Sequence, residues 1–146
     1  MALALLVAGE ARAHPHIWIE VESTLVAEAG AMTAVRHRWT FDALFSAFEV
    51  EGLDADGSGT LDPDELRGLA ERYRQSLPPW SFFTEVRAED GLERHLVVQD
   101  LDLAHANGRL VLDLDLAIEP PVPLDARARV RVHDRTFFVS LAYPSD

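Results

Sequence analysis

The stretch Asn107–Ile118, NGRLVLDLDLAI, decides the fold class of this 146-residue chain. Asn-Gly favours a type I′ hairpin turn, because both central residues of that turn need a positive φ. After the turn, apolar residues fill every second position, the two-residue period of a strand with one buried face. These residues are Leu110, Leu112, Leu114, Leu116 and Ile118. The stretch therefore predicts a β-hairpin whose second strand belongs to the core.

The same period recurs on both sides of this stretch. Residues 17–27 alternate in the same way, a turn follows at Ala29-Gly30-Ala31, and a second strand has Val35, His37, Trp39 and Phe41 on one face, which together predict a first hairpin. Residues 82–88 and 95–103 are predicted strands that flank an Asp90-Gly91 turn. Two short strands, 128–132 and 137–141, are predicted to follow a proline-rich connector at residues 120–123.

Between residues 42 and 77 the period changes to that of a helix. Leu44, Phe45 and Phe48 have helical spacing, and a longer helical stripe of apolar residues runs from Leu66 to Leu77. Asp62-Pro63-Asp64-Glu65 is a typical helix start, and Pro78-Pro79 ends the second helix. The predicted fold is α+β: a mainly antiparallel, sandwich-like β domain with an inserted EF-hand-type helix-loop-helix at about residues 42–77.

The composition narrows the functional classes. The net charge of −12 argues against a nucleic-acid-binding protein, because such a chain has no basic field to attract phosphates. Cysteine is absent, which excludes disulfides, thiolate metal sites and cysteine nucleophiles. The length fits one domain, and no run reaches the roughly 18 apolar residues of a membrane span, so the mature chain is not expected to insert into a membrane.

The N-terminus resembles the end of a secretory signal peptide. An apolar run, ALALLVAG, precedes Ala11-Arg12-Ala13, which has the A-x-A form of a cleavage site. We therefore predict a short signal peptide at residues 1–13 and a single periplasmic domain at residues 14–146. The alternative is the apolar N-terminal tail of a cytosolic protein.

The loop from residue 54 to residue 65 carries the clearest functional pattern. EF-hand loops bind calcium through positions 1, 3, 5, 7, 9 and 12 and have glycine at position 6. Gly59 occupies position 6, and Leu61, at position 8, is apolar as such loops require to pack against a neighbouring strand. The predicted calcium ligands are Asp54, Asp56, Ser58, Thr60 through its carbonyl, Asp62 (often through water) and Glu65.

Position 5 departs from the strict pattern, which has Asp or Asn where this chain has Ser58. Serine still offers an oxygen, but the loop has one charge fewer than an all-Asp version. The competing interpretation is an acidic turn between two helices that binds nothing. A single loop of this kind favours a static, stabilising ion over a sensor that opens.

The histidines suggest a second metal site. Cleavage after Ala13 would make His14 the N-terminal residue, with an α-amine and an imidazole for one metal ion, and His16 would add a second imidazole. His133, beside Asp134, could complete the site if that end of the chain meets the N-terminus. The alternative is that His14 and His16 belong to an exposed tail. His37 lies on an apolar strand face, so we expect a hydrogen-bonded core histidine, and we expect His95 and His105 at the surface.

Several motifs together resemble a known family. They are A-H-P-H at residues 13–16, W-T-F-D at 39–42, L-D-A-D-G-S-G-T-L-D-P-D-E-L at 53–66 and H-D-R-T-F-F-V at 133–139. They are similar to those of the bacterial periplasmic family known as domain of unknown function 1007. That resemblance implies a periplasmic protein linked to ABC-type and nickel/cobalt-type metal transport.

Three hypotheses follow. The first is a periplasmic metal-binding protein that holds calcium, handles nickel, cobalt, zinc or copper, and assists an inner-membrane metal transporter. The second is a structural or interaction module that calcium stabilises and that docks on such a transporter without a transition metal. The third is a histidine-brace oxidase. No serine has the setting of a nucleophile and no carboxylate pair stands out, so we predict that the protein is not an enzyme.

Overall fold

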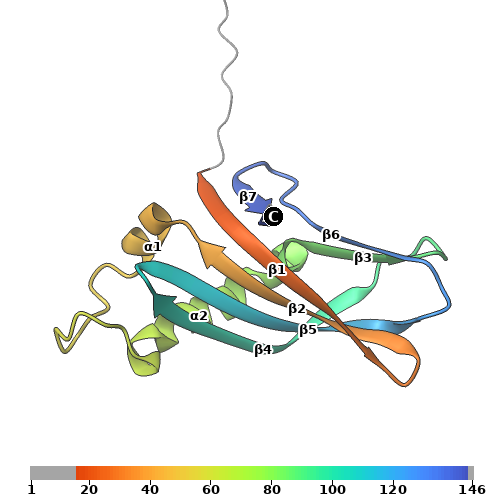
Figure 1. Ribbon diagram of the computed structural model, residues 1–146, viewed down its shortest axis with the longest axis horizontal. Helices are drawn as coiled ribbons and strands as arrows, with labels where there is room; N and C mark the ends of the chain where they lie inside the picture. The colour runs from red at the N-terminus through yellow and green to blue at the C-terminus, as the bar shows by residue number, and fades with distance from the viewer. Residues whose placement is uncertain (1–15, 145–146) are drawn as a thin grey trace, which may run out of the picture.

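The computed structural model describes residues 16–144 and consists mainly of strands. Five of them form one mixed sheet in the order β4-β5-β2-β1-β7, and two form a small separate sheet, β3-β6 (Figure 1). The strands are β1 (Ile17–Glu28), β2 (Ala31–Phe41), β3 (Thr84–Ala88), β4 (His95–Ala106), β5 (Arg109–Pro123), β6 (Ala128–Val132) and β7 (Val139–Ala142). The helices are α1 (Ala43–Glu49), α2 (Pro63–Ser76) and the 3₁₀ helix η1 (Pro78–Phe83).

The two predicted hairpins supply four of the five strands of the large sheet. β1 pairs antiparallel with β2 and β4 with β5, and the Asn107-Gly108 turn has the positive φ angles, 53° and 74°, that a type I′ turn needs. β2 and β5 then pair with each other. The five alternating residues from Leu110 to Ile118 are all buried, as predicted.

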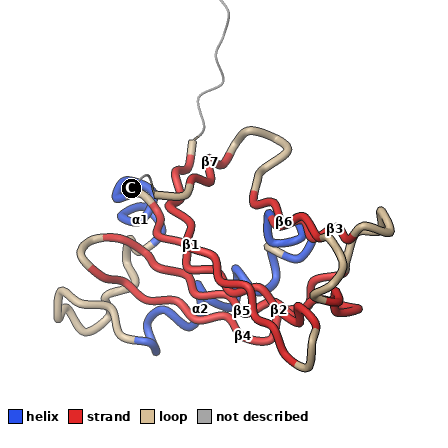
Figure 2. The backbone as a smooth tube through the Cα atoms, turned by 45° about the vertical axis from the view of Figure 1, so that its right-hand side comes forward, coloured by secondary structure: helices blue, strands red, loops and turns tan. Residues whose placement is uncertain are grey.

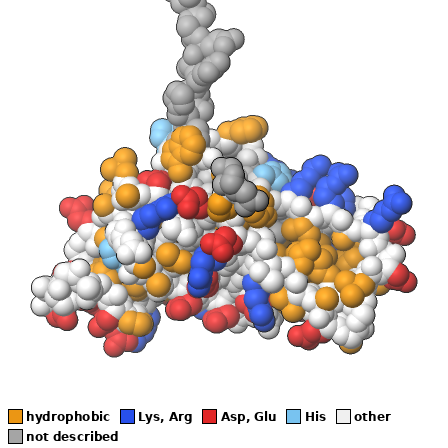
Figure 3. Space-filling model, in the orientation of Figure 1, with side chains coloured by type: hydrophobic (Ala, Val, Ile, Leu, Met, Phe, Trp, Pro, Cys, Tyr) orange, Lys and Arg blue, Asp and Glu red, His pale blue; other side chains and the backbone are white. Residues whose placement is uncertain are grey.

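The two faces of the large sheet differ in chemistry. One face is apolar and packs against Leu66 and Leu69 of α2 and Val86 of β3 in a common core. The other carries cross-strand ion pairs: Arg36 binds Asp115 and Arg38 binds Asp113, each at 2.8 Å. Figure 3 shows such opposite charges side by side over the molecular surface. The alternation in sequence is therefore an alternation between core and solvent.

The C-terminal strand joins the sheet in a way that the local pattern did not predict. β7 pairs parallel to β1, with Ile17 opposite Val139, so the large sheet is mixed rather than wholly antiparallel. The chain reaches this edge by crossing from the small sheet through the loop between β6 and β7 (Figure 2). The second layer is thus a two-stranded sheet with helices, not a second full sheet.

Two other predictions need correction. The proline-rich segment 120–123 is not a connector, because β5 continues to Pro123, which lies opposite Ala31 of β2. Phe82 and Phe83 do not begin a strand. They belong to η1 and, with Ser81, have φ near +50°.

The helices are fixed to the sheet by specific hydrogen bonds. In α1, the buried Ser46 hydroxyl accepts the amide of Leu110 at 2.9 Å, while Arg74 of α2 donates to the carbonyl of Leu101 in β4 at 3.1 Å. Phe45 packs against the core, but Leu44 and Phe48 face solvent. None of the helices in residues 16–144 has the length and apolarity needed to cross a membrane.

Candidate metal centre

The acidic loop, residues 54–65, lies between α1 and α2, away from the two-stranded sheet (Figure 1). Its far end is fixed by a capping box: the Asp62 carboxylate accepts the amides of Asp64 and Glu65, and Glu65 in turn accepts the amide of Asp62. The predicted helix start is confirmed. Glu65 is therefore held where α2 begins, facing the first residues of the loop.

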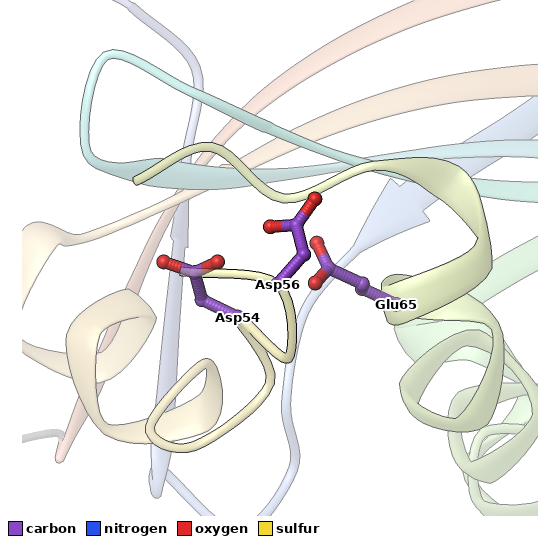
Figure 4. A group of neighbouring side chains, drawn as sticks. All are labelled: Asp54, Asp56 and Glu65. Atoms are coloured by element: carbon purple, nitrogen blue, oxygen red, sulfur yellow. The ribbon is translucent and has the colours of Figure 1, made fainter. Parts of the chain in front are cut away.

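Three carboxylates meet inside this loop. One oxygen from each of Asp54, Asp56 and Glu65 lies within 4.8 Å of the other two. In Figure 4, Asp54 and Asp56 come from the entering chain and Glu65 from the first turn of α2, and their side chains gather in one region. The predicted ligand positions 1, 3 and 12 are thus brought together.

The loop backbone is organised around the same side chains. Asp54 accepts the amides of Ser58 and Gly59, each at 3.0 Å, and Asp56 also accepts the amide of Ser58, at 2.9 Å. Gly59 has φ 79°, which L side chains rarely adopt, so glycine suits this bend. Hydrogen bonds from Ser58 lower the pKa of Asp56 below its ordinary value, so this carboxylate is charged at neutral pH.

The other predicted ligands, Ser58, Thr60 and Asp62, form hydrogen bonds of their own. The Ser58 hydroxyl donates to the carbonyl oxygen of Thr60 at 2.9 Å, so the donors of positions 5 and 7 are neighbours. Asp62 lies outside the group of three carboxylates and caps α2. Leu61 is partly buried against the core, as expected for a residue that anchors the loop.

The charge of the group is not balanced by basic side chains. Within residues 16–144, every ion pair of an arginine or histidine goes to a carboxylate other than Asp54, Asp56 and Glu65; Arg67, for example, pairs with Asp64. Like charges this close repel one another, and a cation would relieve that repulsion. All the donors on offer are oxygens, the kind that calcium and magnesium prefer.

The histidine site predicted from sequence is not assembled within the described residues. His14, the signal peptide at residues 1–13 and the cleavage position lie outside them. The His16 amide donates to the carbonyl of Phe138 at 2.9 Å, and its ring lies 4.9 Å from the ring of Phe138. His133 has its Nε2 3.9 Å from Glu85. In residues 16–144, neither His16 nor His133 belongs to a group of three metal-binding side chains.

Asp134, considered beside His133 as a ligand, has a structural role. Its carboxylate accepts the amides of Thr136, Phe138 and Val139 at 2.8 to 3.0 Å, and also the hydroxyl of Thr136. Burial opposes ionisation of this group, but the hydrogen bonds outweigh burial and lower its pKa. Asp134 thus organises the turn that leads into β7.

His37 is a hydrogen-bonded core histidine, as predicted. Its Nδ1 lies 2.8 Å from the Ser23 hydroxyl and its Nε2 lies 3.1 Å from the Thr84 hydroxyl. Thr84 donates its proton to the carbonyl of Phe82, so it accepts from Nε2–H, and Nδ1 accepts from Ser23. Burial lowers the pKa of His37 to about 4. Neither contact was predicted: Ser23 lies opposite His37 in the predicted first hairpin, whose register was not assigned, and nothing local shows that Thr84 of β3 meets β2. Of the other two histidines, His95 is exposed and His105 is half-buried.

Comparison with known families agrees with the motifs at residues 13–16, 39–42, 53–66 and 133–139. A family model described as "Protein of unknown function (DUF1007)" matches residues 1–146. The chain belongs to the DUF1007 family. No curated protein and no solved structure matches it. Family membership therefore assigns no activity, and the function of this DUF1007 protein has to be argued from the site.

Proposed function

We propose that this DUF1007 protein binds one calcium ion in the acidic loop and that the ion serves as a structural element. Asp54, Asp56 and Glu65 would hold the ion, with the Ser58 hydroxyl, the Thr60 carbonyl and, through water, Asp62 as further donors. The ion would supply positive charge at a point where residues 16–144 supply no basic partner.

The observation that carries the proposal is the convergence of three carboxylates that form no ion pair with a basic side chain of residues 16–144. Ligand atoms of Asp54, Asp56 and Glu65 lie within 4.8 Å of one another, although they are separated by up to eleven positions in the chain. An acidic turn without a ligand would be expected to spread its charges or to pair them with arginine. The order of donors also follows the EF-hand pattern, including glycine at position 6.

Calcium suits these donors better than the alternatives. The donors offered are all oxygens, whereas nickel, copper and zinc sites usually include nitrogen or sulfur. The loop is exposed, and its backbone bends at Gly57 and Gly59, both with positive φ. Calcium accepts an irregular shell of oxygens, whereas magnesium demands a tighter octahedral shell.

The ion would stabilise the start of α2 and its connection to α1. Glu65 belongs both to the capping box and to the carboxylate group, so a cation would fix the first turn of α2 to the loop. This favours the interaction-module hypothesis, in which calcium rigidifies the helix pair. A periplasmic location, transition-metal handling through His14, His16 and His133, and partnership with a transporter stay predictions from the sequence.

Thermal unfolding of the chelator-treated chain, with and without calcium, tests the proposal. A ligand that binds only the folded state stabilises it, by about 2.7 kcal/mol at a ligand concentration 100 times Kd, and so raises the unfolding midpoint. Glu65→Gln should remove most of this rise, while glutamine can still complete the capping box. Glu51→Gln, which removes an equal charge just before the loop, should keep the rise. An equal calcium response in all three proteins, or none in the native chain, would contradict the proposal.

A further inference from the structure

A second feature of the fold is an apolar pocket between the large sheet and the helices. It has a volume of about 180 Å³. Its floor is made by fully buried residues of the sheet, Trp39 and Leu112 among them, and Ser76 and Trp80 are its exposed members. The acidic loop contributes no residue to it, so the pocket is independent of the proposed calcium site.

Aromatic rings dominate the walls of this pocket. Two of the three tryptophans and one of the two tyrosines in the sequence line it. The rings are close to one another: Phe41 lies 5.2 Å from Phe45 and 5.9 Å from Tyr73, and Phe83 lies about 6 Å from both tryptophans. The six aromatic residues are Trp39, Phe41, Phe45, Tyr73, Trp80 and Phe83.

The walls offer little to a charged ligand. No charged side chain lines the pocket within the described part of the chain. The buried Nε1 of Trp39 exposes less than 1 Å², so the wall presents the indole ring and not its N–H. The Tyr73 hydroxyl already donates to Glu49 at 3.3 Å, and burial together with the Glu49 charge raises the pKa of this phenol, which keeps it neutral. An ion in this pocket would lose its hydration without gaining a partner.

We propose that this pocket binds a small, neutral, ring-containing molecule of the size of a monosubstituted benzene. An apolar cavity of about 150 Å³ is large enough for benzene, which sets the scale. Flat rings gain from edge-to-face and offset contacts with the aromatic walls. One uncharged polar substituent could remain at the exposed side, beside the hydroxyl of Ser76.

Tryptophan fluorescence tests this proposal on the full chain. Trp18 is absent from the pocket, so Trp18→Phe leaves two tryptophans that both line it. Titration of that variant with benzyl alcohol should give a saturable change in emission. Benzoate, with the same ring and a charge, should bind at least tenfold more weakly. Absence of saturation with benzyl alcohol, or equal binding of benzoate, would overturn the proposal.

A pair of enlargements on β1 locates the binding. Ile17 lines the pocket, and Ile17→Phe should fill part of it and weaken benzyl alcohol binding at least tenfold. Leu25→Phe, the matched control, enlarges an exposed residue of the same strand outside the pocket and should leave binding unchanged. Circular dichroism and unfolding midpoints establish that both variants fold. Unchanged binding in a folded Ile17→Phe chain would place the molecule elsewhere and contradict the proposal.

Discussion

Two acidic turns of this molecule hold negative charge in different ways. At the turn before β7, one carboxylate, Asp134, is nearly buried and accepts three backbone amides and a hydroxyl. In the acidic loop, three exposed or half-buried carboxylates approach one another without a basic partner among residues 16–144. The comparison teaches that acidity alone does not indicate a cation site. Several carboxylates held close together, with no basic partner among residues 16–144, are the better indication.

His37 belongs with Asp134 in this comparison. Both are polar groups in the interior whose hydrogen-bonding atoms are matched by the fold, His37 by two hydroxyls and Asp134 mainly by backbone amides. Such groups are expected to act on stability alone. The acidic loop should instead act on stability only when a cation is present.

Asp134→Ala should have the largest effect. It removes the charged acceptor of three amides at the start of β7, and a hydrogen bond to a charged group contributes about 1.5–3 kcal/mol, so we expect a loss of about 4 kcal/mol. Urea unfolding measures it. Asp125→Ala, at an exposed aspartate, should change stability by no more than about 0.5 kcal/mol. If calcium reversed the loss of stability, Asp134 would belong to a metal site, and its purely structural role would be contradicted.

The second prediction concerns pH. The pKa of His37 falls from 6.5 to about 4 on folding, so the unfolded chain binds more protons between these values and stability decreases as pH falls through this window. At about 1.36 kcal/mol per pKa unit, the full decrease from this residue is about 3 kcal/mol.

Urea unfolding between pH 7.5 and pH 5 measures this slope. His37→Gln should flatten it, because glutamine does not titrate, while His95→Gln, at an exposed histidine, should keep it. If the native chain and His37→Gln lost stability in parallel, burial of a neutral imidazole would not be the cause.

Ser58→Asp, a change in the acidic loop, should have the smallest of these effects on free energy. A fourth carboxylate at position 5 should tighten calcium binding about tenfold, or about 1.4 kcal/mol. Without calcium the same change adds repulsion and should lower stability slightly. Ser58→Asn, which offers an oxygen but no charge, should bind calcium about as well as the native chain. Calcium titration of the three proteins decides whether charge or donor geometry limits this loop.

The parts of the fold that local sequence determines were predicted. The strand alternation at 17–23 and 110–118, the Asn107-Gly108 turn and the capping box at Asp62 depend on neighbouring residues, and all are confirmed, although Leu25, predicted on the apolar face of the first strand, is exposed. The parallel pairing of Ile17 with Val139 was not predicted, because no local pattern specifies a partner more than a hundred residues away. The continuation of β5 through Pro120–Pro123 was missed for the same reason: pairing with β2 overrides the usual preference of proline for connectors.

The candidate sites differ in the same respect, since one lies within a contiguous segment and the others do not. The acidic loop is a contiguous segment, so spacing alone anticipated the approach of Asp54, Asp56 and Glu65. The contact of His37 with Thr84, and the aromatic pocket, are assembled from strands and helices that are distant in the sequence. No one-dimensional pattern contains them, and only the three-dimensional arrangement brings them together.

Isothermal titration of calcium into the chelator-treated chain tests the central claim most directly. The account predicts saturation at one ion per chain, loss of binding in Asp54→Asn and native-like binding in Asp125→Asn, which removes the same charge from an exposed position outside the loop. No binding to the native chain, or equal binding to Asp54→Asn, would contradict the claim that the acidic loop holds a calcium ion.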